Sequence, residues 1–534
     1  MLVDFDKSRR YNQSALREDL IKKSLFLAVG LGIVASVILF VNRIFLGDAF
    51  TAEEAQHAMY GLWIWHDIRV FDLAGFIYDT NRQLVWPFMH SWLTAVFFLV
   101  FGANYLSARL MSLVIFGATL FLMYRFTTKL CDNTKNVCDP HGRRVGILAV
   151  ILVLTSPLML QYATMTMLEG LGALLFMLAA YLYVVSEEQK LAIEYIAFVF
   201  LLGLSLYVNY LYAYLLIPAF FVMTLAQLAP IALAAFRVER HGEHKAMHFI
   251  WWGYRKLIVL MVFLFLGGLW FSFSFSRKVL LLFNSIFKYS GGTVVTNIWE
   301  SLLYYPKVII TQVSFSPWLG VFIFVSLFLP LVTARYRGLK TLYIYIWTVL
   351  LLLTMTIPTK APQMMYIIIP FVFIVFSGVV VYFYDWLTAK NKQYGMLLLI
   401  VLFLPSLISL PALGRAYFPE RAEHNLVNVL DYFEQTVPPD SPLLVMFNLK
   451  HLNLDGVRFH LKDWGGDVVD GTNLVESADG ETYYLAIVLD ETSPYQVEVV
   501  DDASIDEGMM AGLELFSSQR FESIGLTAQV FRKK

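Results

Sequence analysis

Two adjacent carboxylates and a histidine stand just after the first long apolar run of this chain. Glu53 and Glu54 lie four and three residues before His57, so on a helix both carboxylates can share a face with the imidazole. Ionisable groups are costly to bury at a membrane boundary, and side chains kept there despite that cost are candidates for function. The stretch therefore predicts a functional site where the chain leaves the membrane.

These residue types allow two kinds of chemistry. A carboxylate can act as a general base and take a proton from a reacting group. Glu54 and His57 also have the carboxylate–histidine spacing of helical di-metal sites. Such sites need the motif twice, and the sequence has no second copy, so we predict no metal or cofactor and keep a divalent ion as the alternative.

The composition indicates a polytopic membrane protein. Of the 534 residues, 58% are hydrophobic and 15% are charged, unlike an ordinary soluble enzyme. A spanning helix needs about 20 apolar residues. Residues 87–101 form a run of about 15, which predicts a helix that lies in the interface or re-enters. Eleven segments are predicted to span: 24–46, 106–129, 146–166, 170–185, 191–208, 210–235, 257–275, 317–333, 341–357, 364–384 and 395–413.

Loop charge predicts the orientation of these spans. If residues 87–101 do not cross, about 21 lysines and arginines fall on one side, against about 7 in the opposite short loops. The positive-inside rule then places the amino-terminal residues 1–23 in the cytoplasm. The membrane domain is predicted to cover residues 24–413, with a first outer loop at 47–105 that carries interfacial helices.

This orientation gathers ionisable side chains on the extracytoplasmic face. A long outer loop contains residues 297–305, which predict an amphipathic, aromatic helix at the level of the lipid headgroups. The candidate site residues on this face are Glu53, Glu54, His57, Arg82, His90, Arg109, Glu169 and Lys360, with Tyr366 at the next span.

The last part of the chain, residues 414–534, has the composition of a soluble domain. It carries 9 basic against 21 acidic residues, whereas residues 1–413 carry 31 against 20. Helical periodicity at 421–437 and short apolar runs at 443–447, 457–461, 483–489 and 496–500 predict a small α/β domain on the outer face.

The first outer loop resembles that of the GT-C glycosyltransferases, membrane enzymes that use polyprenyl-phosphate sugars. They include the protein O-mannosyltransferases and the lipid A aminoarabinose transferase. Bacterial members carry Asp-Glu-Ala-x-His-Ala after the first span, and residues 53–58 here read Glu-Glu-Ala-Gln-His-Ala. A proline-led apolar stretch ending in Phe-Gly at 101–102 and an Ala-Arg-Leu at 108–110 follow, as in the family. This chain has Glu53 where Asp is usual, and Arg82 is the nearest cation before Pro87, where the family has a lysine.

The resemblance implies the GT-C fold and a role for each candidate residue. Glu53 corresponds to the family's catalytic aspartate, and Glu54 would orient it or bind a neighbouring backbone group or cation. Glu169 follows Ser156-Pro157 as the second family acid does, and Arg109 would clamp the donor phosphate with paired hydrogen bonds. Lys360 and Tyr366 lie in a stretch like the family's Lys-x-Pro-Arg/His-Tyr, although Met365 replaces the cation. Lys360 would bind the donor phosphate together with Arg109. His57, Arg82, His90 and Tyr366 are also assigned to substrate binding.

Less specific interpretations remain open for single residues and for the whole chain. Glu53 can be a helix-capping carboxylate, and His57 can be a packing residue. The chain can be a transporter or flippase of lipid-linked sugar, or a catalytically silent protein that binds such a lipid. We favour an enzyme of the inner or plasma membrane that moves a sugar from a polyprenyl-phosphate donor to a lipid, glycan or protein acceptor. Dispersed basic residues argue against nucleic acid.

Overall fold

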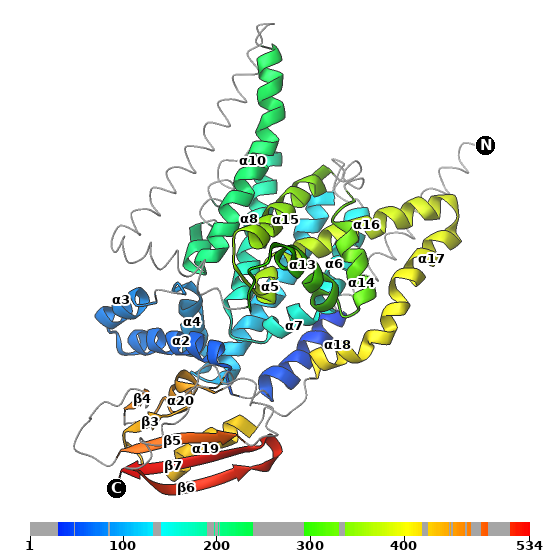
Figure 1. The fold of residues 1–534 in the computed structure, drawn as a ribbon. Helices are drawn as coiled ribbons and strands as arrows, with labels where there is room; N and C mark the ends of the chain where they lie inside the picture. Colours follow the sequence, from blue (N-terminus) through cyan, green and yellow to red (C-terminus); the bar gives the residue numbers. More distant parts are fainter. Residues whose placement is uncertain are drawn as a thin grey trace.

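The structure is a computed structural model of the 534-residue chain. It describes residues 30–46, 49–83, 86–131, 140–189, 197, 201, 203–238, 293–329, 337–418, 425–447, 449, 452–464, 467–470, 482–489 and 513–533. A helical bundle forms the centre, and the carboxyl-terminal sheet lies at its lower end, with α10 (Tyr210–Val238) extending from the opposite end (Figure 1).

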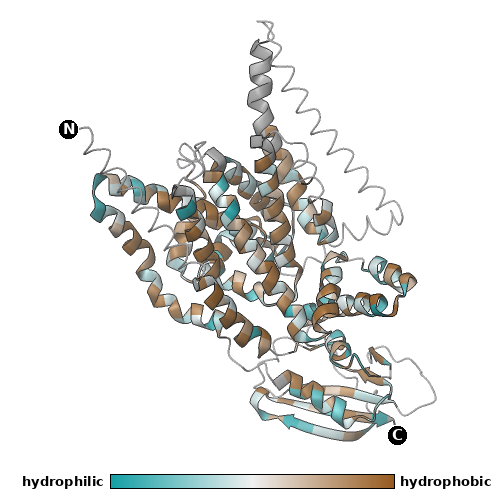
Figure 2. Ribbon diagram, turned by 180° about the vertical axis from the view of Figure 1, so that it is seen from behind, coloured by the Kyte–Doolittle hydropathy of each residue, from teal (hydrophilic) through white to brown (hydrophobic). Residues whose placement is uncertain are grey.

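Long apolar helices make up the bundle. Four helices in the described residues are long and apolar enough to cross a membrane: Tyr105–Cys131 in α5, Leu168–Val185 in α8 (Leu168–Gln189), α16 (Ile369–Lys390) and Lys392–Tyr417. The last comprises α17 (Lys392–Phe403), the 3₁₀ turn η7 (Pro405–Ser409) and α18 (Leu410–Tyr417). Only 11% of its most apolar window is buried inside the protein, so its hydrophobic surface must face lipid. Figure 2 shows how hydrophobic residues dominate the bundle, while hydrophilic ones appear in the carboxyl-terminal sheet.

The predicted count of eleven spans is reproduced only in part. Shorter apolar helices stand at four further predicted positions, as Gly30–Phe45, Tyr210–Met223, Pro317–Ser326 (α14) and Leu339–Met355 within α15 (Arg337–Met355). The predicted span 257–275 and most of 191–208 lie outside the described residues. The chain is an integral membrane protein whose span number stays a prediction.

The predicted span 146–166 is broken near its middle. The helix α6 (Pro140–Leu154) ends there, and α7 (Pro157–Ala163) continues at an angle of 72°. Pro157 cannot donate a backbone hydrogen bond into α6, and the Ser156 hydroxyl accepts one from the Met159 N–H at 3.4 Å, which starts a new helix. This break points the following segment, with Glu169, toward the outer loop.

The first outer loop folds into three helices that lie across the end of the bundle (Figure 1). They are α2 (Ala52–Val70), α3 (Leu73–Asn81) and α4 (Met89–Phe101). With 13 residues, α4 is shorter than a spanning helix, which agrees with the interpretation of 87–101 as an interfacial or re-entrant element. Gly61 lets α4 pack closely on α2, because a Cβ there would lie 2.5 Å from Thr94 Cγ2. Gly102, with φ of 83°, ends α4.

The described part of the long loop that contains residues 297–305 begins with a short strand. β1 (Thr293–Val294) pairs antiparallel with β2 (Thr359–Lys360), and the pairing sets Thr293 opposite Lys360. The helix α13 (Ile298–Val308) follows and continues into a π-helical turn, η4 (Ile309–Val313). Trp299 and Leu303 on α13 are 70% and 65% exposed, as expected for the interfacial helix predicted at 297–305.

The carboxyl-terminal part contains a five-stranded sheet in the order β4-β3-β5-β7-β6, with α19 (Asn425–Thr436) and α20 (Leu454–His460). Its strands are β3 (Leu443–Val445), β4 (Val468–Asp470), β5 (Tyr483–Leu489), β6 (Leu513–Phe521) and β7 (Leu526–Lys533). β3 runs parallel to β4 and β5, and β7 runs antiparallel to β5 and β6. The helix predicted at 421–437 and the runs at 443–447 and 483–489 correspond to α19, β3 and β5, while 496–500 lies outside the described residues.

The run at 457–461 is not extended, as its apolar pattern suggested, but forms the end of α20. The Asn453 side chain caps this helix by accepting from the Gly456 N–H at 2.9 Å. Val457 and Leu461, four residues apart, face the sheet's core, whereas Phe459 packs with Phe50 in a cluster on α2. A strand would have put all three on one face, so α20 couples the sheet to the outer loop only because it is helical.

Candidate functional site

Glu54 is buried at the start of α2 and bonded to two other parts of the chain. Its carboxylate is 1% exposed and accepts from the Thr51 N–H at 3.1 Å and from the Thr166 N–H at 2.9 Å. The Thr51 hydroxyl accepts in return from the Glu54 N–H, which completes a capping box at the start of α2. These bonds tie the first turn of α2 to the segment that precedes α8.

Arg109, on α5, provides the charge that balances Glu54. Its Nε lies 3.3 Å from Glu54 Oε1 and its Nη2 lies 3.3 Å from Oε2, a two-pronged ion pair between buried side chains. Nη2 also donates to the Ala49 carbonyl at 3.2 Å, and the guanidinium stands 5.2 Å from the centre of the Phe50 ring. The expected phosphate clamp is therefore engaged with the protein's own carboxylate, and its role toward a donor stays a prediction.

The ion pair between Glu54 and Arg109 also positions Glu53, the residue before Glu54. Successive residues of a helix project about 100° apart, so fixing Glu54 against Arg109 also fixes the direction of Glu53. The Glu53 side chain is exposed. The bond from the Thr166 N–H to Glu54 holds the start of α2 against the segment that leads to Glu169 in the first turn of α8. The two acids that the resemblance singled out thus lie on segments that the structure joins.

Glu169 lies in the first turn of α8 and is 8% exposed. Its Oε2 is buried without a hydrogen-bond partner among the described residues. A buried carboxylate oxygen left unsatisfied costs on the order of 1–3 kcal/mol, and such groups deserve a functional explanation.

Tyr366, a predicted site residue, packs against a second tyrosine, Tyr162 on α7. The ring of Tyr366 stands 5.6 Å from that of Tyr162, and its hydroxyl donates to the Met159 carbonyl at 3.4 Å. Tyr212 on α10 interacts with Glu169. Tyr162 stood inside the motif around Glu169, but nothing in its spacing marked it.

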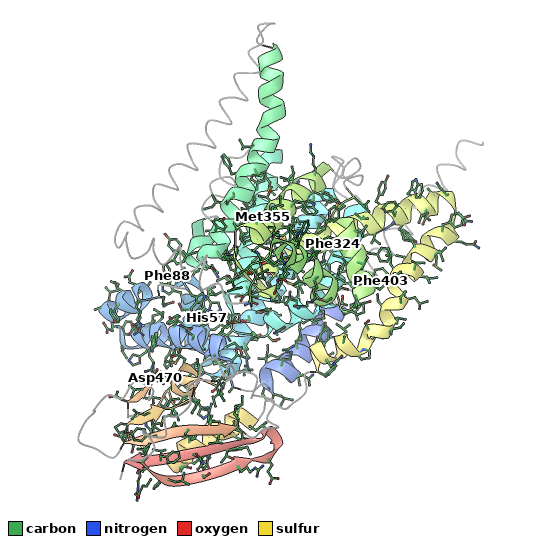
Figure 3. All side chains as sticks on the ribbon, viewed as in Figure 1. His57, Phe88, Phe324, Met355, Phe403 and Asp470 are labelled. Carbon is green, nitrogen blue, oxygen red and sulfur yellow. The ribbon has the colours of Figure 1, made fainter. Side chains whose placement is uncertain are left out.

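His57 and His90 form a buried pair between α2 and α4. Their ring centres lie 5.4 Å apart, and Trp86 packs on His57 at 5.2 Å. Burial and then the neighbouring His90 lower the pKa of His57 well below its ordinary value, so the imidazole is neutral at pH 7. Figure 3 shows His57 where α2 meets the bundle. In the described part of the chain, Glu54 and His57 belong to no group of three metal-ligand side chains, and metal dependence stays a prediction.

Arg82 is held within the loop helices themselves. Its Nε pairs with Asp79 Oδ1 at 2.9 Å, and its guanidinium stacks 3.4 Å from the centre of the Trp63 ring. These contacts join the end of α3 to α2. A substrate-binding role for Arg82 stays a prediction, and its observed contacts stabilise the α2–α3 hairpin.

Lys360 makes contacts that the sequence did not reveal. Its ammonium is 1% exposed and donates to the carbonyls of Leu353, Thr354 and Ile357 around the end of α15, at 2.6 and 2.9 Å for the first two. Burial lowers the pKa of Lys360 to about 8. All three N–H donors of the ammonium are used, so binding a phosphate would require breaking these bonds.

Replacing Lys360 tests which role dominates. Lys360→Met should lower the melting temperature in detergent by several degrees, because three buried carbonyls lose a charged donor and such bonds are worth about 1.5–3 kcal/mol each. The exposed Lys340→Met, on the helix α15 whose end Lys360 caps, is the matched control and should melt like the parent. An unchanged melting temperature for Lys360→Met together with weakened donor binding would contradict the capping role.

The helical bundle and its outer loop resemble the fold of the GT-C glycosyltransferases. Residues 86–235 match the sequence pattern of the family described as dolichyl-phosphate-mannose-protein mannosyltransferase. No curated protein matches the chain at the level of sequence.

Solved structures extend the likeness to nearly the whole chain. ArnT from Cupriavidus metallidurans in the apo state aligns with a TM-score of 0.58 at 11% identity, covering 95% of this chain and 97% of that one. The same enzyme bound to undecaprenyl phosphate aligns with a TM-score of 0.56 at 12% identity and the same coverage. The resemblance to the GT-C glycosyltransferases is confirmed, by the fold over 95% of the chain and by the family pattern over residues 86–235.

Proposed function

We propose that this protein transfers a sugar from a polyprenyl-phosphate carrier to an acceptor on the extracytoplasmic face of the membrane. The observation that carries the proposal is the buried Glu54–Arg109 pair, which holds the first turn of α2, with Glu53, against the segment that leads to Glu169 in α8. The nature of the carrier is supported by two likenesses. The matching family is described by a dolichyl-phosphate sugar, and the undecaprenyl-phosphate complex of ArnT has the same fold.

In the proposed reaction Glu53 is the general base. It takes the proton of an acceptor hydroxyl or phosphate while the acceptor oxygen forms a bond to C1 of the sugar. The bond from C1 to the carrier's phosphate oxygen breaks, and its electron pair stays on the leaving phosphate. Glu169 faces the positive charge that develops at C1 and lowers its energy.

The other candidate residues position these two acids. Glu54, held by Arg109 and by two backbone N–H groups, fixes the direction of Glu53. In the proposal Arg109 therefore acts through Glu54, and a donor-phosphate contact from its remaining N–H groups is a second, weaker possibility. No metal is required for this step, because the proton has a carboxylate acceptor.

The orientation in the membrane rests on loop charge. The excess of lysines and arginines in alternate loops supports a cytoplasmic amino terminus and an extracytoplasmic carboxyl-terminal sheet. The contact of α20 with α2 puts that sheet on the side of the proposed acids.

Comparing lipids and glycans from three strains tests the proposal. Mass spectrometry of a deletion strain should show an unused polyprenyl-phosphate sugar and a missing sugar on one lipid, glycan or protein, and the parent gene should restore it. The purified protein in nanodiscs should then transfer that sugar with both substrates present. Absence of transfer by the parent protein, combined with a changed sidedness of the lipid-linked sugar, would replace the enzyme with a flippase.

A further inference from the structure

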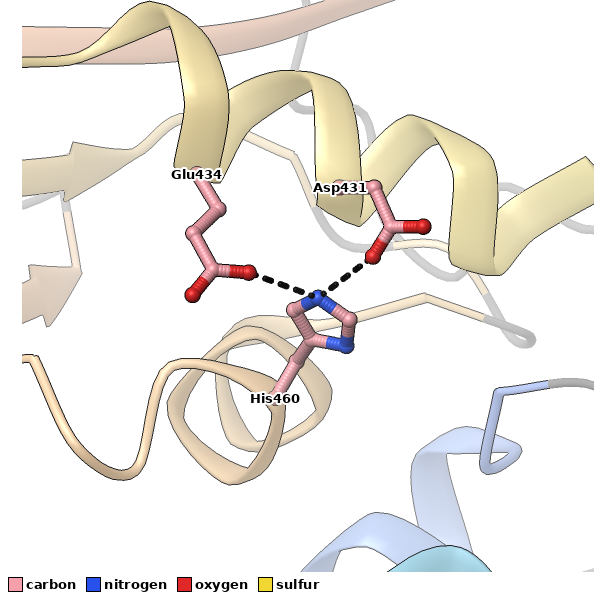
Figure 4. A group of neighbouring side chains, drawn as sticks. All are labelled: Asp431, Glu434 and His460. Atoms are coloured by element: carbon pink, nitrogen blue, oxygen red, sulfur yellow. Dashed lines mark ion pairs between the residues drawn. The ribbon is translucent and has the colours of Figure 1, made fainter.

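A second group of ionisable side chains lies away from the proposed acids, between the two helices of the carboxyl-terminal part. Asp431 and Glu434, three residues apart on α19, face His460 at the end of α20 (Figure 4). His460 Nε2 lies 3.1 Å from Asp431 Oδ1 and 3.5 Å from Glu434 Oε2. One ligand atom from each residue lies within 4.8 Å of the other two.

These separations suit a small divalent cation. Zinc binds imidazole nitrogen and carboxylate oxygen at about 2.0–2.2 Å, so two ligands of a tetrahedral site stand about 3.4 Å apart. The two distances from His460 Nε2 fall on either side of this value. A cation at this point would neutralise two carboxylates and bind a neutral imidazole, which is the donor set that suits zinc and similar metals.

An ion pair between His460 and the carboxylates explains this arrangement less well than a bound metal ion does. His460 Nε2 is buried and makes no hydrogen bond of acceptable geometry among the described residues. A single N–H could in any case donate to only one of the two carboxylates in a linear bond. A metal at this nitrogen would be held by both.

The other ring nitrogen is already oriented by the membrane domain. His460 Nδ1 lies 3.3 Å from the hydroxyl of Tyr105, the first residue of α5. With Nδ1–H donating to that hydroxyl, Nε2 is left as the lone-pair nitrogen that faces the two carboxylates. Metal-binding histidines regularly donate their second N–H in this way.

An ion can reach the group from solvent on the side of its two carboxylates. The side chains of Asp431 and Glu434 are 42% and 52% exposed, against 11% for His460. Water can thus reach the remaining coordination positions. The surroundings are acidic, since residues 414–534 carry 9 basic against 21 acidic side chains, which attracts cations.

We propose that Asp431, Glu434 and His460 bind a divalent metal ion of the zinc type, which fixes α19 to α20 where α20 docks on the outer loop. Neighbouring Phe459 packs on Phe50 and Tyr105, with ring centres 4.8 and 5.3 Å away. Holding α20 in place therefore holds the sheet against the start of α2. This role is structural and does not depend on the proposed sugar transfer.

Zinc binding by the full-length protein, carrying a tag without histidine, tests the site. After chelator treatment, titration should show a site of about one Zn²⁺ per chain and a rise in melting temperature. His460→Ala and Asp431→Asn should each weaken binding at this site at least about tenfold and abolish the rise. Asp440→Asn removes an exposed carboxylate of the same part of the chain, in a turn with φ of 66° that asparagine also tolerates, and should bind zinc like the parent.

Two results would overturn the proposal. One is the absence of stoichiometric binding by the parent protein. The other is equal affinity and an equal rise in melting temperature for the parent, His460→Ala and Asp431→Asn. His460→Ala can also introduce a packing defect. Asp431→Asn keeps the size of a partly exposed side chain and should fold like the parent, so a loss of binding in this variant reports the loss of a ligand.

Discussion

Glu53→Gln is expected to lower turnover by at least about a hundredfold while donor binding stays nearly normal. Glutamine keeps the volume and hydrogen-bonding capacity of the side chain but cannot accept the acceptor's proton, and general-base assistance supplies on the order of 10²–10⁴ in rate. The exposed position of Glu53 means that its loss should not unfold the loop. Steady-state transfer and donor affinity, both measured in nanodiscs, separate the two effects.

Neighbouring acids supply the controls for this result. Glu53→Asp restores the residue usual in the resembling family and should be much milder, because it still accepts a proton. Glu169→Gln should also lower turnover, since it removes the charge that faces C1. If Glu53→Gln turned over at the parent rate while Glu169→Gln were inactive, Glu169 would be the base.

Arg109→Ala is expected to cost about 3–5 kcal/mol of stability, because it leaves the Glu54 carboxylate buried without its counter-charge. Glu54 is 1% exposed and Arg109 is 6% exposed, so water cannot replace the lost partner. Thermal unfolding in detergent measures the effect. Arg109→Lys should be intermediate, since an ammonium cannot reproduce the two-pronged contact.

An ion pair elsewhere in the bundle gives a matched comparison. Arg144 Nη1 lies 3.3 Å from Asp385 Oδ1, the same separation, but the Arg144 side chain is 35% exposed. Arg144→Ala should therefore cost no more than about 1 kcal/mol. Equal melting temperatures for Arg109→Ala and Arg144→Ala, with donor affinity lost only in the first, would favour the phosphate clamp over the anchoring role.

Local patterns in the sequence were enough to determine the class of the protein. Runs of apolar residues reveal membrane helices because the cost of exposing backbone groups to lipid applies to each segment on its own. The order of carboxylates, histidine and arginine in the first loop is equally local, and it led to the GT-C resemblance that the fold confirms. The periodicity around Val429 and Phe433 likewise predicted α19, whose buried face has that spacing.

The partners of the polar groups were decided by the tertiary structure alone. Glu54 meets Arg109 across 55 residues and the Thr166 N–H across 112, and any residue at position 166 other than proline could supply that N–H. Lys360 donates to carbonyls at the end of α15, which its place in the sequence did not predict. Such contacts depend on how helices pack.

The same reason explains the group at the end of α20. Asp431 and Glu434 show a spacing that many solvent-exposed helices have, and His460 lies in a run whose apolar residues suggested a strand. Only the folding of 454–460 into a helix places its imidazole opposite α19. Sequence spacing specifies which residues share a face of one element, whereas the meeting of two faces is determined by the packing of the whole core.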